Sequence, residues 1–207
     1  MHVAPAFAEA DLGALDALIA RNPFATLVTV AEGLPCATPL PVLYRRDGAR
    51  IVIEGHWARA NPQSSHTGPA LLIVHGPHAY VSPGWYPDKD ALARVPTWNY
   101  ATAHLHGQLQ RSEDEAQLAD LVARLSERHE RALDSDWRYE PHNPAHRRQL
   151  RGIVGFRIEV ERAELKFKLN QNHPQANQQA VAQALQAMDD PGAQAVAELM
   201  RTRLATP

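Results

Sequence analysis

The sequence has little of what secreted, membrane or nucleic-acid-binding proteins need. Its single cysteine, Cys36, allows no disulfide within the chain, which is typical of a reducing compartment. It lacks the roughly 20 consecutive apolar residues of a membrane-spanning helix, and Glu9, Asp11 and Asp16 interrupt the apolar start, unlike in a signal peptide. The net charge of -2 and the pI of about 6.6 provide no basic field for a nucleic acid. We therefore expect a cytoplasmic protein without a membrane segment.

The signatures of several enzyme and metal-protein classes are absent or incomplete. There is no Gly-x-Ser-x-Gly elbow, phosphate loop or dinucleotide-binding glycine pattern, which argues against hydrolases and nucleotide-binding enzymes of these kinds. Two histidine pairs, His104 with His106 and His75 with His78, could each supply two ligands to a metal. A zinc site needs three or four converging ligands, so we assign no metal residues.

Hydrophobic patterns predict strands with interspersed helices. The segment "DLGALDALIARNP" predicts a short helix with Asp11 as N-cap. Strands are expected at 24–31, 35–46, 49–56, 70–76, 79–82, 97–110 and, as one long or two short strands, 153–169. Asp47-Gly48 predicts a hairpin turn, and the long aromatic loop at 83–96 is typical of a functional loop.

Three further helices complete the pattern. Ser112 and Glu115 predict a capping box that opens a helix with its apolar face at Leu118, Leu121, Val122 and Leu125. Two C-terminal helices are expected near 177–188 and 191–204, the second with Asp190 as N-cap. Without a regular βαβ alternation, the layout favours an antiparallel barrel, mainly β with α (α+β), over a doubly wound sheet.

Four clusters repeat one combination of aromatic, amide and cationic residues: "HWARANPQ", "SPGWYP", "PTWNY" and "KFKLNQNHP". Aromatic rings can wall a flat heteroaromatic ligand, and amides can read the edges of its rings. Arg59 and Lys168 can neutralise a phosphate. These clusters predict a site for a flat, phosphate-bearing cofactor.

Seven segments carry a family resemblance: "NPFATLV", "ATPLP", "GHWARANPQ", "HGPHAYVSPGWYP", "VPTWNYATAHLHG", "IVGFRIEV" and "KLNQNHP". In this order they resemble the PaiB-like FMN-binding proteins, which are similar to the pyridoxamine 5'-phosphate oxidase-like split barrels and are described as negative transcriptional regulators. The resemblance implies a homodimer with an antiparallel six-stranded split β-barrel that holds FMN in two clefts between subunits. It divides the chain into an FMN-binding domain, 1–172, and a C-terminal helical extension, 173–207, packed on the same domain.

The resemblance also implies the cofactor-binding residues. Arg59 matches the basic residue near the FMN phosphate, and Thr38 would lie along the isoalloxazine. The remaining expected contacts are His56, Asn61, Gln63, Trp98, Asn99, Tyr100, Lys168, Gln171 and Asn172. Three residues depart from the family pattern: Pro39, His106 and Asn170. Pro39 removes a backbone donor beside the expected flavin. We therefore expect either weaker FMN occupancy or an altered ligand.

Three functions stay open at this point. The first is an FMN-binding homodimeric redox- or ligand-responsive regulator, without direct DNA contact because the C-terminal segment lacks clustered basic residues. The second is an FMN-dependent oxidoreductase of a small molecule, with the "SPGWYPDKD" loop (82–90) as lid and His78 or Tyr86 as proton donor. The third is a histidine metal-binding protein without flavin.

Overall fold

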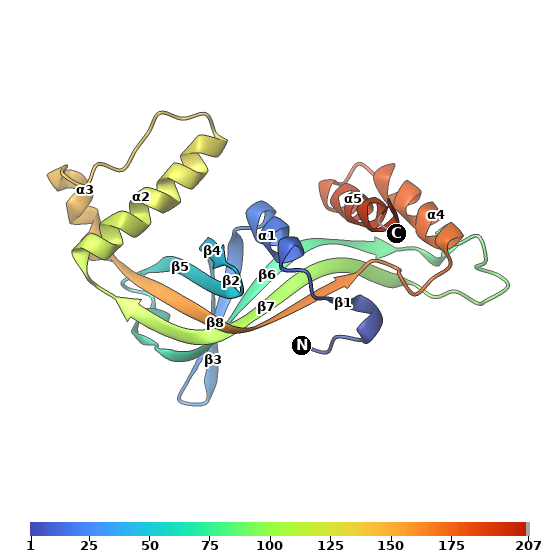
Figure 1. Cartoon of the computed structure of the whole chain (residues 1–207), viewed down its shortest axis with the longest axis horizontal. Helices are drawn as coiled ribbons and strands as arrows, with labels where there is room; N and C mark the ends of the chain where they lie inside the picture. Colours follow the sequence, from blue (N-terminus) through green and yellow to red (C-terminus); the bar gives the residue numbers. More distant parts are fainter. Residues whose placement is uncertain (206–207) are drawn as a thin grey trace. The chain divides into compact units, whose positions relative to one another are not determined.

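The structure is a computed structural model in which residues 1–205 are described. Within this range, eight strands are hydrogen-bonded in the order β3-β2-β6-β7-β8-β5-β4, with β1 paired to β8 (Figure 1). The strands are β1 (Ala8–Glu9), β2 (Phe24–Ala31), β3 (Leu34–Pro41), β4 (Leu43–Asp47), β5 (Arg50–Ala58), β6 (Gly68–Val81), β7 (Thr97–Ser112) and β8 (Ile153–Lys168). The pairs β1–β8, β2–β3, β2–β6, β4–β5 and β5–β8 are antiparallel.

Helices flank this sheet. The α-helices are α1 (Leu12–Arg21), α2 (Glu115–Ala132), α3 (Pro144–Gln149), α4 (Gln175–Gln186) and α5 (Pro191–Ala205). Short 3-10 turns are η1 (Pro5–Phe7), η2 (Pro62–Ser65), η3 (Pro83–Trp85) and η4 (Leu150–Gly152). In the described part of the chain, no helix combines the length and the apolar character that crossing a membrane requires.

The chain divides into two compact units, which we describe separately. The first unit contains Met1–Arg21, His75–Ala103 and the chain from Glu164 onward. The second unit contains Asn22–Val74 and His104–Ala163. Strands β6, β7 and β8 each contribute one part to each unit.

The second unit is built from the β2–β3 and β4–β5 hairpins and from α2. The β4–β5 turn forms at Asp47 and Gly48, where Gly48 has a φ of 57°, as the Asp-Gly signal predicts. In its core the Trp57 and Phe156 rings pack with centroids 4.7 Å apart. A side chain at Gly55 would come within 2.5 Å of the Phe156 ring, so glycine makes room for this aromatic pair.

Helix α2 forms where it is predicted, but its cap differs. The Asp114 carboxylate accepts a hydrogen bond from the Gln117 backbone N–H at 2.9 Å and is therefore the N-cap. Ser112, predicted to cap the helix, instead donates its hydroxyl proton to the Gln117 side chain at 2.7 Å. The aspartate wins because it adjoins the first turn of the helix, whereas Ser112 is still the last residue of β7. The helix buries Leu118, Leu121 and Leu125.

The first unit packs α1, α4 and α5 with the adjoining parts of β6, β7 and β8. Figure 1 shows α4 and α5 side by side at the C-terminus. Both aspartate caps are confirmed: the Asp11 carboxylate accepts from the Gly13 N–H at 2.8 Å, and the Asp190 carboxylate accepts from the Ala193 N–H at 2.9 Å. The buried residues that join these helices to the strands include Leu15, Leu18, Ile19, Val181, Leu185, Val196 and Met200.

Two strand predictions need correction. The predicted strand 35–46 is divided into β3 and β4 at Val42, whose backbone N–H bonds to the Pro23 carbonyl at 2.9 Å. The strands expected at 70–76 and 79–82 are one continuous strand, β6, because Gly76 and Pro77 stay extended within it. The division of 35–46 and the two-residue strand β1 account for the difference between six expected and eight observed strands.

Candidate functional site

Five of the predicted cofactor residues lie in the second unit, around η2. The Asn61 side chain accepts from the Gln63 backbone N–H at 2.9 Å and so caps this turn. The same side chain donates to the Thr38 hydroxyl at 3.1 Å, which ties the turn to β3. A threonine hydroxyl that accepts one bond still has its own proton to donate. Thr38 and Asn61 are therefore in contact, although β3 pairs with β2 and not, as expected, with β5, and the Thr38 hydroxyl keeps a proton for a ligand.

Gln63 is completely buried and links four neighbours. Its amide nitrogen donates to the Leu27 carbonyl at 3.1 Å, the Thr29 hydroxyl at 2.9 Å and the Cys36 carbonyl at 3.0 Å. Its amide oxygen accepts from the Trp57 indole N–H at 3.1 Å. Both ends of the amide are thus hydrogen-bonded within the protein, and these bonds tie the η2 turn to β2, β3 and β5.

Arg59 is anchored by its whole guanidinium group. Its Nε donates to the Arg151 carbonyl at 2.7 Å, its Nη2 donates to the Ile153 carbonyl at 3.1 Å, and its Nη1 pairs with the Glu113 carboxylate. The hydrogen bond from Arg59 lowers the pKa of Glu113. Glu113 therefore already neutralises this guanidinium, and any other anion that bound to it would compete with Glu113.

His56 offers the clearest opening for a ligand in the second unit. Its Nδ1 atom is buried and has no hydrogen-bond partner among residues 1–205. Burial also lowers the pKa of His56 and so favours the neutral imidazole. Since a buried polar atom without a partner is costly, a ligand that bonds to this nitrogen would be stabilised. An orphaned imidazole, a free hydroxyl proton on Thr38 and a guanidinium together fit a phosphorylated flat cofactor such as FMN.

Pro39, the departure from the family pattern, lies on β3 at the edge of the sheet. It stands opposite Thr26 of β2 and is exposed. An edge strand tolerates proline because one side of the strand has no neighbour, so the hydrogen bond that proline cannot donate is not needed there.

The other six predicted residues lie in the first unit. Three of them, Trp98, Asn99 and Tyr100, follow one another on β7 and do not all point to the same face of the strand. Trp98 is 52% exposed, whereas Asn99 is completely buried and donates to the Met200 sulfur at 3.4 Å. Tyr100 again lies on the outer side, with the Lys166 ammonium 5.3 Å from its ring centroid. Side chains alternate between the faces of a strand, so the "PTWNY" motif does not form one surface. Asn99 faces α5, and only Trp98 and Tyr100 share a face.

Lys168 and Trp98 lie next to each other. The Lys168 ammonium donates to the Trp98 carbonyl at 2.9 Å and to the Thr97 hydroxyl. Burial lowers its pKa. Gln171, by contrast, closes its own turn, accepting from the Leu169 N–H at 2.6 Å and donating to the Phe167 carbonyl.

A cavity of about 320 Å³ in the first unit is lined by Lys168 and Asn172 together with residues that the sequence patterns did not identify as ligand contacts. The most prominent are Arg94 and His173. Arg94 comes from the long loop at 83–96, and His173 follows the "KLNQN" motif. Their signal was present in "SPGWYPDKDALARVP" and "KLNQNHP", but only the fold shows that these segments meet.

The chain is similar to known proteins of one family. Residues 1–162 match the family FMN_bind_2, described as "Putative FMN-binding domain". The chain belongs to this family. This match confirms both the predicted family and the predicted cofactor, FMN. The chain is also similar to "Protease synthase and sporulation protein PAI 2" of Bacillus subtilis (strain 168), with 34% identity over 190 residues, 90% of this chain and 89% of that protein.

Two solved structures share the fold. The FAD and heme binding protein from Mycobacterium smegmatis has a TM-score of 0.56 and 18% identity, over 78% of this chain and 73% of that one. The flavocytochrome Anf3 from Azotobacter vinelandii has a TM-score of 0.54 and 18% identity, over 80% of this chain and 72% of that one. The predicted class, an antiparallel split barrel with flanking helices, is confirmed.

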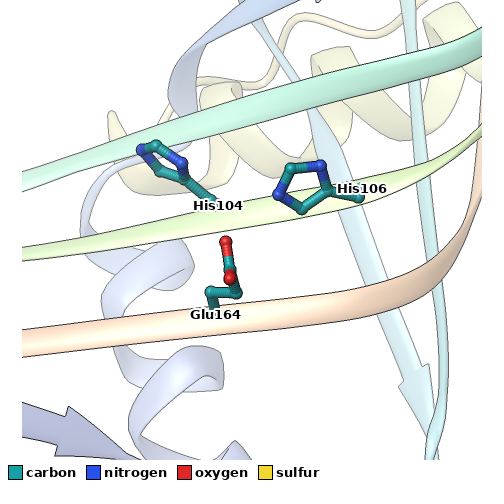
Figure 2. A group of neighbouring side chains, drawn as sticks. All are labelled: His104, His106 and Glu164. Carbon is teal, nitrogen blue, oxygen red and sulfur yellow. The ribbon is translucent and has the colours of Figure 1, made fainter. Parts of the chain in front are cut away.

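The histidine pair of β7 carries no metal assignment. Figure 2 shows His104 and His106, which belong to the second unit, and Glu164 of β8. The two imidazole rings are 6.4 Å apart and tilted by 58°. Glu164 belongs to the first unit, where its carboxylate pairs with the N-terminal ammonium at 2.9 Å. Two imidazoles alone are fewer ligands than zinc requires.

Proposed function

We propose that this member of the FMN-binding family is a homodimer and that its bound flavin makes it a redox- or ligand-responsive regulator. The observation that carries the regulatory part is the relationship to PAI 2, whose name connects it with sporulation. We assign the flavin to the residues around η2, with Arg59 toward the phosphate and Thr38 and His56 as further contacts. The roles of Lys168, Gln171 and Asn172 toward FMN, and the division at residue 172, stay predictions.

The dimer is supported by apolar side chains on the β2–β3 hairpin. Phe24 is 62% exposed, Val30 65% and Leu34 71%, and β3 is an edge strand of the sheet. Exposed apolar residues on an unpaired edge favour association, because both the side chains and the backbone groups gain a partner. A second copy of the chain is the partner that the family resemblance implies.

Regulation without direct DNA contact is supported by the C-terminal helices. Their basic side chains have partners within the first unit: Arg201 donates to Gln186 at 2.6 Å, and Arg203 donates to Glu9 at 3.1 Å. A helix that reads DNA needs cations available for phosphates. We expect the flavin state to be read by another protein or by a change within the dimer.

A second candidate function is an FMN-dependent oxidoreductase of a small molecule. The observation in its favour is the cavity of about 320 Å³, which Tyr86 lines. The Tyr86 hydroxyl accepts from the Asn170 amide at 2.9 Å, and burial raises its pKa, so it retains a proton that it could donate.

Four measurements on the purified protein test these proposals. A visible spectrum recorded while FMN is added should develop bound-flavin bands with one flavin per chain; a spectrum identical to that of free FMN at every ratio would refute flavin binding. Light scattering should give the mass of two chains. Stopped-flow mixing with NADPH should leave the flavin oxidised; rapid bleaching would favour the oxidoreductase. Gel-shift with random duplex at low salt should show no binding in the micromolar range.

A further inference from the structure

The cavity of the first unit is built from two segments far apart in the sequence. The loop at 83–96 supplies Tyr86, Leu92, Arg94 and Val95, and the end of β8 with the following turn supplies Lys168 and His173. Its volume, about 320 Å³, is at the lower end of the range for small-molecule sites. The sequence motif "DKDALARVP", which contains most of the loop residues, has no role in the flavin site proposed above.

Arg94 is held in place with part of its guanidinium unused. Its Nε and Nη2 donate to the Asp88 carboxylate at 2.9 and 2.5 Å, and the Asp88 carboxylate is itself fixed by the Asn177 amide at 2.8 Å. The guanidinium carbon lies 5.8 Å from the Tyr86 ring centroid. An arginine has five N–H donors, and the Nη1 group of Arg94 has no recorded partner within residues 1–205. This side of the guanidinium is therefore available to an anion.

Lys168 adds a second cation with a spare donor. An ammonium has three N–H groups, and those of Lys168 have two recorded acceptors, the Thr97 hydroxyl and the Trp98 carbonyl. Asp88 balances the charge of Arg94, so Lys168 leaves the cavity with a net positive charge. Both bonds hold the ammonium at the cavity wall, and the third N–H can reach a bound anion.

His173 contributes an unsatisfied polar atom. Its ring stacks on Tyr86 with centroids 4.9 Å apart and planes only 5° apart. Its Nδ1 is buried, with no hydrogen-bond partner in the described part of the chain. Because the ring is fixed by stacking, this nitrogen cannot turn to water without losing the Tyr86 contact. A bound ligand is the partner that would satisfy it.

The opposite part of the lining is apolar and exposed. Leu92 is 59% exposed and Val95 is 71% exposed, although both line the cavity. Between them Ala93 has a φ of 44°, and Asn170, which also lines the cavity, has a φ of 64°. Left-handed backbone at a residue other than glycine is uncommon and often marks a ligand-binding segment. The lining of the cavity thus combines cationic and apolar side chains.

We propose that this cavity is a second ligand site, separate from the flavin contacts proposed around η2, for a small carboxylic acid with an apolar body, and that Lys168 and Asn172 serve this ligand rather than FMN. The carboxylate meets Lys168 and Arg94, the apolar body is covered by Leu92 and Val95, and His173 Nδ1 bonds to a polar atom of the ligand. An apolar carboxylate satisfies both parts of the lining, whereas inorganic phosphate would leave the apolar rim exposed. The site does not depend on bound FMN, so it persists if the proposed flavin function fails.

The experiment is calorimetric titration of the full-length protein with benzoate, both flavin-free and saturated with FMN. Benzyl alcohol tests the need for the charge, and inorganic phosphate tests the need for the apolar body. The variant is Lys168→Met, and its matched control is Lys166→Met, which removes an ammonium two residues away on the same strand that does not line the cavity. Thermal melting of both variants verifies that they are folded.

We expect benzoate to bind, with the same affinity whether or not FMN is present, and Lys168→Met to weaken it about 10- to 100-fold, as for loss of one charge-assisted hydrogen bond. Lys166→Met should leave the affinity within about twofold. The proposal is overturned if benzoate does not bind at millimolar concentration, if FMN displaces it, if phosphate or benzyl alcohol binds equally well, or if both lysine variants weaken it equally.

Discussion

Replacing Gln63 by alanine tests whether this residue is a structural link or a cofactor contact. The substitution removes the bond from the Trp57 indole and the two amide protons that are shared among the Leu27 and Cys36 carbonyls and the Thr29 hydroxyl. At about 0.5–1.5 kcal/mol for each of these three bonds, the sum is about 1.5–4.5 kcal/mol, and the buried partners left unsatisfied favour the upper end of this range. We expect the free energy of unfolding to fall by about 4 kcal/mol, a large part of the 5–15 kcal/mol typical of a domain.

The assay is urea unfolding of the flavin-free protein, followed by far-ultraviolet circular dichroism. Gln108→Ala is the matched control, because Gln108 lies in the same unit, is exposed, and makes one long hydrogen bond of 3.4 Å to Glu161. The control should change the free energy of unfolding by less than about 0.5 kcal/mol. A Gln63→Ala protein within 1 kcal/mol of the wild type in the absence of flavin, but weaker in FMN binding, would refute the structural interpretation and make Gln63 a ligand contact.

Three further predictions address the flavin site, the dimer and the loop. Arg59→Ala should weaken FMN binding about tenfold or more, measured by fluorescence titration. Glu113→Gln should strengthen FMN binding, because it frees the guanidinium of Arg59. If the two substitutions do not change the FMN affinity in opposite directions, the phosphate binds elsewhere. Leu34→Asp should raise the dimer dissociation constant at least about tenfold in light scattering, since it places a charge in an apolar contact, and an unchanged dimer would exclude this hairpin. The Asp88 pKa falls from 3.8 to about 2, first through the hydrogen bond from Arg94. Its folded-state pKa is below the unfolded value, so its contribution to stability is complete above about pH 4 and is lost toward pH 2. The melting temperature of Asp88→Asn should accordingly fall less on acidification than that of the wild type, and parallel curves would contradict this.

Features that depend on neighbouring residues were predictable from the sequence. The helix at 11–23 has its aspartate cap, and the second C-terminal helix begins at Pro191 after Asp190, because capping needs only the next few backbone N–H groups. The Asp47-Gly48 hairpin forms for the same reason. Even the misassigned cap of α2 is a shift of two residues within the right segment.

Features that depend on distant residues were not predictable in this way. The break at Val42 exists because its N–H bonds to Pro23, on the other side of the β2–β3 hairpin. Asn99 looked like a ligand contact in "PTWNY", yet it faces α5, which lies far along the chain. Arg59 looked like a free cation, and its partner Glu113 could not be identified before the strand ends were placed.

By itself the sequence determined the family, the cofactor and the succession of strands and helices, since these follow from motifs and periodicities that neighbouring residues carry. The tertiary structure decided which polar groups remain available. Gln63 and Arg59 are satisfied by residues distant in the sequence, whereas His56 and His173 each keep a buried nitrogen, and Asn99 a buried amide oxygen, without a partner in the described chain. A polar group becomes a binding group when folding removes water from it without supplying a partner, and this depends on the whole packed chain.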